Sequence, residues 1–275
     1  MTRRLFNRTS IPGLIGCLIV GLMSITCLLA PVFAPDRGYD TVGDVWGPIS
    51  TQAWLGYDNL GRDMLIRLLF GGRLTLGLAL ASTVLAMAAG VTLGLLAAIL
   101  KGKTDIIISR LVDTLMSIPT LISGLVVLSA LGTDVPVLIG TVAVLASTRV
   151  FRMTRALAGE IVELEYFEAA RLRKESLFWL ACKEVLPNLA MPLTTEFGMR
   201  LCFNCLLISA LSFLGLGIQP PDADWGSMVR DNASAVGLGG IAPLIPAAAI
   251  ALFVVGVNLI VDWSVAHQSR QETQP

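Results

Sequence analysis

Charged side chains are scarce in this 275-residue sequence. Asp, Glu, Lys and Arg together make up 15% of it, whereas about 25% is typical of a soluble domain. Hydrophobic residues make up 55%, and the mean hydropathy is +0.75. So few charges cannot cover a soluble surface, and the composition predicts an integral membrane protein. Twenty Lys and Arg balance twenty Asp and Glu, which gives no indication of nucleic-acid binding.

Groups that carry chemistry are also scarce. His267 is the only histidine and has no clustered partner. Cys202 and Cys205 have a redox or metal spacing, but they lie in an apolar segment without a histidine, so we interpret them as small core residues. The sequence contains no Gly-x-x-x-x-Gly-Lys-Ser/Thr phosphate loop and no Ser/His/Asp or Cys/His arrangement. We therefore expect no metal site, no bound cofactor, no ATP site and no catalytic residue, and a membrane enzyme lacks a candidate site.

Long apolar runs are abundant. A helix needs about 20 apolar residues to cross the hydrocarbon core of a membrane. Six segments are candidates, at about 11–33, 74–100, 106–131, 135–150, 189–216 and 241–261. The first segment is too long for the core of a signal peptide, so we interpret it as an anchor. The expected fold class is all-α: a polytopic membrane protein with six transmembrane helices.

Lys and Arg are distributed unequally between the two sides of these spans. If the N-terminus is inside, fourteen lie inside and five outside, with Arg200 within the membrane. Cytoplasmic loops are enriched in Lys and Arg, so this distribution predicts that both termini are cytoplasmic. The inside residues are Arg3, Arg4, Arg8, Lys101, Lys103, Arg110, Arg149, Arg152, Arg155, Arg171, Arg173, Lys174, Lys183 and Arg270; the outside residues are Arg37, Arg62, Arg67, Arg73 and Arg230.

The predicted topology divides the chain into three parts. They are an N-terminal tail with the first span and an external segment (1–73), a transmembrane core with its longest cytoplasmic loop at about 152–188 (74–265), and a C-terminal tail (266–275). Residues 61–69 are a candidate amphipathic helix. The external segments 34–73 and 217–240 suit a membrane interface, and simple linkers are the alternative.

The segment 165–175, EYFEAARLRKE, is polar and helix-forming. Apolar residues recur at rough helical spacing around it: Leu164, Phe167, Ala170, Leu172, Leu177 and Leu180. A helix with this pattern is too polar to span a membrane and too apolar on one side to be free in water. We expect it to lie on a surface, either lipid or a protein partner.

Four collinear motifs between about residues 50 and 230 resemble one family. Glu168-Ala169-Ala170, followed by Leu186-Pro187-Asn188, is similar to the EAA loop of ABC importer permeases. LGYDNLGRD at 55–63, SFLGLG at 212–217, and QPP at 219–221 followed by DWG at 224–226 resemble three further motifs of that family. The sequence is identified as a member of the binding-protein-dependent dipeptide/oligopeptide/nickel permeases.

The resemblance implies a cytoplasmic coupling helix between the fourth and fifth spans, docked on an ATP-hydrolysing subunit. The residues it assigns to coupling are Glu165, Phe167, Glu168, Ala169, Ala170, Arg171, Leu186, Pro187 and Asn188. Among these, Glu168 and Ala170 are expected to face the ATPase. It assigns an external-face motif to Gly61, Arg62, Asp63, Trp225 and Gly226.

The implied location is the bacterial inner membrane. The implied partners are membrane lipid, a second homologous permease, two ATP-binding subunits that hold ATP and Mg, and an extracytoplasmic solute-binding protein. The chain itself is then a transport subunit and no enzyme, forming half of a translocation pathway.

Two details of the loop bear on its geometry. Lys174 stands where the family has glycine, which indicates either a continued helix or a turn residue. Pro187 lacks an N–H and favours a bend into the fifth span, with Asn188 as the cap of the new helix. Outside the loop, Tyr57 replaces a threonine of the family.

Glu196 and Arg200 are the candidate pathway residues. They are four positions apart within the fifth span and so share a helix face. Either they line the translocation path, or they form a self-satisfied pair that locks the helix against its neighbours.

The transported solute is a peptide or a related small molecule on this interpretation. Nickel, metal chelates and opine-like solutes are the alternatives within the family. An ion-gradient-driven secondary transporter is the alternative from another class, but it would require more acidic groups at the membrane midplane than Glu196 alone.

Overall fold

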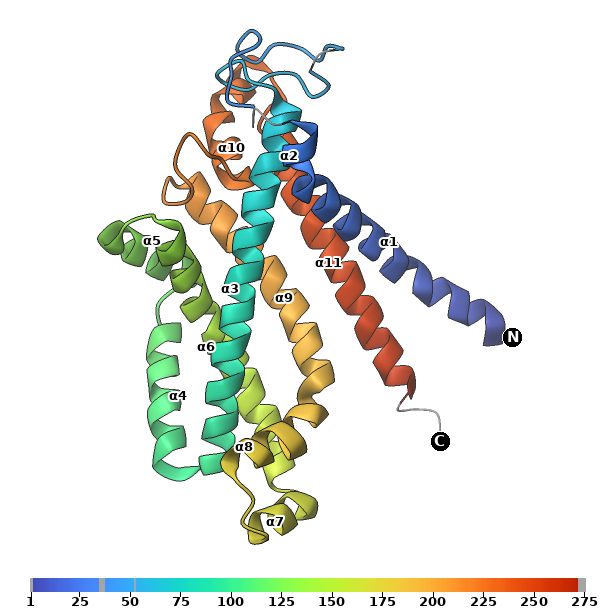
Figure 1. The fold of residues 1–275 in the computed structure, drawn as a ribbon, viewed down its shortest axis with the longest axis vertical. Helices are drawn as coiled ribbons and strands as arrows, with labels where there is room; N and C mark the ends of the chain where they lie inside the picture. Colours follow the sequence, from blue (N-terminus) through green and yellow to red (C-terminus); the bar gives the residue numbers. More distant parts are fainter. Residues whose placement is uncertain (1, 35–37, 52, 272–275) are drawn as a thin grey trace.

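A computed structural model describes residues 2–34, 38–51 and 53–271 of the chain (Figure 1). In these ranges all named elements are helical, and an isolated bridge pairs Tyr57 with Asp63. The elements are α1 (Thr2–Leu28), α2 (Ala30–Phe33), α3 (Met64–Leu100), α4 (Gly102–Met116), α5 (Thr120–Leu131), α6 (Val135–Val162), α7 (Glu165–Leu172), α8 (Leu177–Trp179), the π-helical η1 (Leu180–Val185), α9 (Leu186–Phe213), α10 (Trp225–Asp231), the 3-10 helix η2 (Ala233–Leu238) and α11 (Leu244–Gln271). The predicted all-α, polytopic architecture is therefore confirmed for the described residues.

Within the described residues, five continuous helical stretches are long and apolar enough to cross a membrane. They are Ile11–Leu28, Met64–Leu100, Val135–Val162, Leu177–Phe213 and Leu244–Ala266. A sixth crossing exists only if α4 and α5, which are bent by 88° at a short break, count as one broken span. The prediction of a continuous third helix over 106–131 is wrong. A proline disfavours helical backbone at the residue that precedes it. Pro119 is itself in an extended conformation and separates α4 from α5.

The second span begins, and the fourth span ends, well away from the predicted residues. The second span begins at Met64 because the side chain of Asp63 caps α3 by accepting hydrogen bonds from the N–H groups of Leu65 and Ile66. The separate amphipathic helix predicted over 61–69 is therefore wrong, and the domain boundary after residue 73 falls inside α3. The fourth span continues as α6 to Val162, so the polar loop is shorter than the predicted 152–188.

Close packing of α3 against α6 forms the centre of the bundle. A Cβ atom on Gly90 would lie 2.5 Å from the Cβ of Val150, and one on Gly94 would lie 2.7 Å from the Cβ of Thr154. Small residues at such positions let helix backbones approach closely in a membrane. Cys202 and Cys205 are free thiols buried in the apolar core, as predicted.

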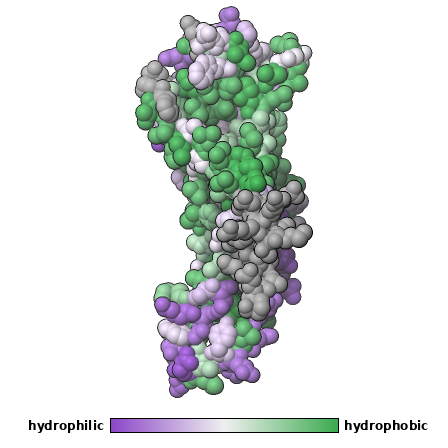
Figure 2. Space-filling model, turned by 90° about the vertical axis from the view of Figure 1, so that its right-hand side faces the viewer, coloured by the Kyte–Doolittle hydropathy of each residue, from purple (hydrophilic) through white to green (hydrophobic). Residues whose placement is uncertain are grey.

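The molecule has two polar ends separated by an apolar middle. Figure 1 shows α7 and α8 at one end, and α10 with the preceding loops at the other. The face in Figure 2 is hydrophobic over its middle and hydrophilic around the end that carries α7. The start of α1 and the end of α11 point toward the α7 side in Figure 1. The described ends of α1 and α11 thus point toward the end that carries α7, while the assignment of that side to the cytoplasm stays a prediction.

Candidate functional site: coupling loop and transmembrane ion pair

Helix α7 is fastened to the rest of the chain by two side chains. Phe167 is 1% exposed and Ala170 is 0% exposed, and both belong to a buried cluster with residues of α3, α6, η1 and α9. They are three positions apart and therefore lie on one helix face. The expectation that Ala170 faces an ATPase is wrong, because Ala170 packs inside its own chain.

The other face of α7 is exposed. The apolar set expected on one face is divided: Phe167, Ala170 and Leu180 are buried, whereas Leu164, Leu172 and Leu177 are exposed. Leu172 is 78% exposed. We name the exposed residues of α7 the outward face; it consists of Glu165, Tyr166, Glu168, Ala169, Arg171 and Leu172. This face combines apolar side chains with both signs of charge, and it contains Glu168, whose docking on an ATPase stays a prediction.

Lys174 is a turn residue. Its φ is +58°, in the left-handed region that favours glycine, and its N–H donates to the carbonyl of Arg171 at 2.9 Å. α7 ends at Leu172, and the side chain of Ser176 then caps α8 by accepting from the N–H of Trp179. Of the two interpretations of Lys174, the continued helix is therefore wrong.

The entry to the fifth span differs from the prediction. α8, η1 and α9 form one helical stretch, Leu177–Phe213, so Pro187 does not separate the loop from the span. The wider π-helical turn η1 precedes Pro187, whose missing N–H and ring are not compatible with an ordinary mid-helix position. Asn188 is no cap: its Nδ2 donates to the carbonyl of Glu184 at 2.6 Å and to the hydroxyl of Tyr166 at 3.3 Å. Asn188 therefore ties α9 to α7, a contact that the sequence did not reveal.

Glu196 and Arg200 form the expected ion pair. The Nε of Arg200 lies 2.7 Å from Oε1 of Glu196. The side chain of Arg200 is 7% exposed and that of Glu196 is 14% exposed. The guanidinium of Arg200 also lies 4.8 Å from the ring centroid of Phe203. This geometry is an ion pair, and Arg200 also borders open space.

A cavity of about 400 Å³ lies beside this pair, between α5, α6 and α9. Arg200, Phe203 and Asn204 of α9 line it, together with Arg149 of α6 and Thr120 of α5. Glu196 is not among the lining residues. The sequence analysis placed Arg149 at the inner end of a short span, but α6 continues to Val162 and holds Arg149 near its middle.

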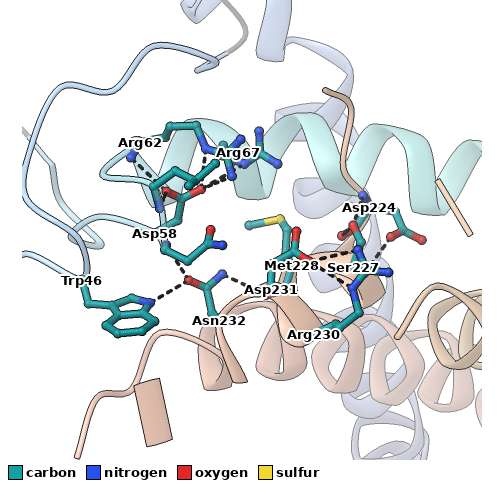
Figure 3. Close-up of polar contacts among 12 residues, drawn as sticks. Trp46, Asp58, Arg62, Arg67, Asp224, Ser227, Met228, Arg230, Asp231 and Asn232 are labelled. Carbon is teal, nitrogen blue, oxygen red and sulfur yellow. Dashed lines mark hydrogen bonds and ion pairs between the residues drawn. The ribbon is translucent and has the colours of Figure 1, made fainter. Parts of the chain in front are cut away.

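The external-face motif fastens the loops at the opposite end (Figure 3). Asp58, which is buried, receives hydrogen bonds from the backbone N–H and Nε of Arg62 and pairs with Nε of Arg67 at 3.4 Å. Gly61 has a φ of +72°, and a Cβ there would lie 2.1 Å from the carbonyl oxygen of Gly43. Asp58 was not predicted, although its carboxylate holds the arginine of the motif in place.

Trp225 and Gly226 join α10 to the core. The indole N–H of Trp225 donates to the carbonyl of Leu68 at 2.9 Å. A Cβ on Gly226 would lie 2.2 Å from the carbonyl oxygen of Ser209, so only glycine allows this approach to α9. Asp224 begins α10 by accepting from the N–H of Ser227 at 2.8 Å, and burial raises the pKa of its carboxyl. These residues position the end of the bundle that carries α10.

Asn232 connects the loop before α3 to the end of α10, a role that was not predicted. Its Oδ1 accepts from the indole N–H of Trp46 at 3.2 Å and from the backbone N–H of Asn59 at 2.9 Å, as drawn in part in Figure 3. Its Nδ2 donates to the carbonyl of Met228. No sequence motif surrounds Asn232, so only the tertiary structure identifies it.

Comparison with known proteins gives a family. Residues 90–273 match the family described as binding-protein-dependent transport system inner membrane component. The glutathione transport system permease protein GsiD of Pectobacterium atrosepticum is 32% identical over 91% of this chain and 82% of its own length. The di/tripeptide transport system permease protein DppC of Pseudomonas aeruginosa is 32% identical over 91% of this chain and 85% of its own length. The peptide transport system permease protein SapC of Escherichia coli is 33% identical over 93% and 88%.

These matches cover the spans, the coupling loop and α10. Together with the apolar helices they make the chain a multi-pass protein of the bacterial inner membrane and a transport permease rather than an enzyme. The chain belongs to the binding-protein-dependent transport permeases, the inner membrane components of ABC importers.

Proposed function

We propose that this chain is the permease subunit of an ATP-driven importer of peptides. The relatives named for glutathione, di/tripeptide and peptide transport support this substrate class over nickel, metal chelates or opine-like solutes. Glu196, the acidic residue that a secondary transporter would use, is held in an ion pair with Arg200. The chain forms half of the translocation pathway, and a second homologous permease supplies the other half.

The outward face of α7 is the proposed docking surface for an ATP-binding subunit. The observation that carries this proposal is the division of α7 into two faces. Phe167 and Ala170 fix the helix to the chain's own core, so that Glu168 and Leu172 are presented in a fixed orientation. A surface that is both exposed and rigid can accept force from a partner. Two ATP-binding subunits, which hold ATP and Mg, are the proposed partners on this side.

The opposite end of the molecule is the proposed contact for a solute-binding protein. There Asn232 ties the loop at Asn59 to the end of α10, Asp58 holds Arg62 against Arg67 of α3, and Trp225 ties α10 to α3. A delivery surface requires such fixed loops, because solute must pass from the binding protein to a defined opening.

The docking surface is tested by placing a charge on it. Leu172→Asp introduces a carboxylate at the most exposed apolar position of α7, where binding of the ATPase would desolvate it. We expect the ATP-binding subunits to be lost during purification of the complex from membranes, and uptake of Ala-Ala into proteoliposomes to fall with them.

Leu238→Asp is the matched control. Leu238 is 76% exposed, in η2 at the opposite end of the molecule, so this variant should retain the ATP-binding subunits. Normal copurification of the ATPases with Leu172→Asp would overturn the docking role of α7.

A further inference from the structure

Two arginines line one cavity between helices of the bundle. Arg149 and Arg200 each lie at the midpoint of a 28-residue helix, α6 and α9 respectively. Both line the cavity of about 400 Å³ between these helices. Ionisable residues within membrane-spanning helices are costly and usually face a bundle interior or a water-filled space.

Only one of the two arginines has an acidic partner. Arg200 is paired with Glu196. Arg149 is exposed, and in the described part of the chain no Asp or Glu side chain lies within ion-pair distance of it. The three charged groups therefore sum to one uncompensated positive charge beside the cavity.

The ring of Phe203 lies close to both guanidinium groups. Its ring centroid lies 5.9 Å from Cζ of Arg149 and 4.8 Å from Cζ of Arg200. Cation–π contacts of this kind hold an arginine without neutralising its charge. Both guanidinium groups therefore line one space with their positive charge retained.

We propose that this cavity binds the free carboxylate of the transported solute, with Arg149 as its principal ligand. This inference rests on the proposed transport function and narrows its substrate class. A guanidinium binds a carboxylate through two parallel hydrogen bonds, which supplies orientation as well as affinity. Arg200, whose Nε is engaged by Glu196, adds positive charge and is the second wall of the site.

The chemistry of the site selects among solutes. A cavity of about 400 Å³ falls within the usual range of small-molecule sites, about 300–1,000 Å³. It accommodates a short peptide with a free C-terminus. A divalent metal cation is excluded as the ligand, because it would meet an uncompensated positive charge and no free carboxylate.

The first test measures the anion preference of the cavity without any transport. Leu145 lines the cavity one helical turn from Arg149, so Leu145→Cys places a thiol there. In the assembled complex, in nanodiscs of neutral phosphatidylcholine, we expect a negatively charged methanethiosulfonate to modify this thiol several-fold faster than a positively charged one. Adding Arg149→Gln should remove that preference.

Two outcomes of this test overturn the anion site. One is equal reactivity of the two reagents while Arg149 is present. The other is a preference that disappears when phosphatidylglycerol is added to the nanodiscs, because a lipid headgroup would then be the occupant. Arg149→Lys, which keeps the charge, should retain the preference and shows whether a loss in Arg149→Gln is caused by misfolding.

The second test measures uptake of Ala-Ala by the full complex in proteoliposomes. Arg149→Gln should lower uptake about tenfold or more, the size expected for losing a hydrogen-bonded charge pair. Arg152→Gln is the matched control: Arg152 lies three positions further along α6, is exposed and does not line the cavity. It should change uptake less than twofold.

The two tests separate the two proposals. Unchanged uptake with Arg149→Gln, or an equal loss with Arg152→Gln, overturns the solute site. A complex that imports no peptide while the thiol test still shows anion preference contradicts the proposed transport function and leaves the anion site standing.

Discussion

Replacing Phe167 with alanine should detach the coupling helix α7 from the rest of the chain. The ring of Phe167 is buried among residues of α3, α6, η1 and α9. Truncating a buried phenylalanine to alanine costs about 3–5 kcal/mol. α7 has eight residues, too few to be stable as an isolated helix, so packing maintains it. The loss should therefore appear as local opening of α7.

Hydrogen–deuterium exchange of residues 163–176 measures this opening. Each 1.4 kcal/mol is tenfold in an equilibrium, so the loss corresponds to an increase of about 100- to 4,000-fold in the open population. The exchange of α7 rises by that factor or up to the unprotected limit, whichever is smaller. The central parts of α3 and α9 should keep their protection, because the main apolar cluster does not include Phe167.

Leu172→Ala is the control for Phe167→Ala. Leu172 is exposed on the same helix, so its truncation should leave exchange unchanged while weakening capture of the ATP-binding subunits. Unchanged exchange in Phe167→Ala would refute the conclusion that this ring holds α7. Faster exchange throughout the molecule would instead show that α7 and the bundle unfold together.

Three further predictions concern stability, measured as the thermal midpoint of the purified chain in detergent. Lys174→Gly should raise stability by up to about 1 kcal/mol because glycine adopts the φ of +58° without strain, and a lower midpoint would contradict this. Gly90→Ala should cost about 1–3 kcal/mol because its Cβ would meet Val150 at 2.5 Å, whereas Gly77→Ala, with no atom within 4 Å, should not destabilise; equal losses would refute the packing argument. Burial raises the pKa of Asp224 above its ordinary value of 3.8, so the folded state binds this proton more tightly than the unfolded chain, and stability should fall as the pH rises from below 3.8 through the raised pKa. Asp224→Asn should remove that dependence; an unchanged pH profile would show that another group causes it.

The sequence predicts those features that depend on local spacing. Glu196 and Arg200 pair because four positions return a helix to the same face. Lys174 stands where the family has glycine, and this difference marked the position at which the backbone adopts a left-handed φ. Composition and apolar runs predicted the helical membrane class for the same reason, since each span is specified by its own residues.

Features that depend on neighbouring helices could not be predicted in this way. A span predicted from a run of apolar residues ends at the first charged residue. Arg149 was therefore placed at the end of a helix. In the structure, cavity space and the ring of Phe203 accommodate its charge in the middle of α6. Ala170 was assigned to a partner because its motif is known for coupling, but the burial of Ala170 depends on the cluster around Phe167.

The placement of the two walls of the cavity relates coupling to solute binding. α6, which carries Arg149, ends at Val162, only two residues before α7 begins. The wall that carries Arg200 belongs to the continuous stretch Leu177–Phe213, which starts just after α7 and is bonded to it through Asn188. A displacement of α7 by a partner is thus applied to both walls close to their ends. Arginine side chains bind a carboxylate only within hydrogen-bond distance. A small change in the separation of α6 and α9 would therefore be enough to weaken carboxylate binding in the cavity. The polar helix α7 and the two arginines beside the cavity would then form one mechanical unit, in which the Glu196–Arg200 pair stiffens the α9 wall while the width of the cavity changes.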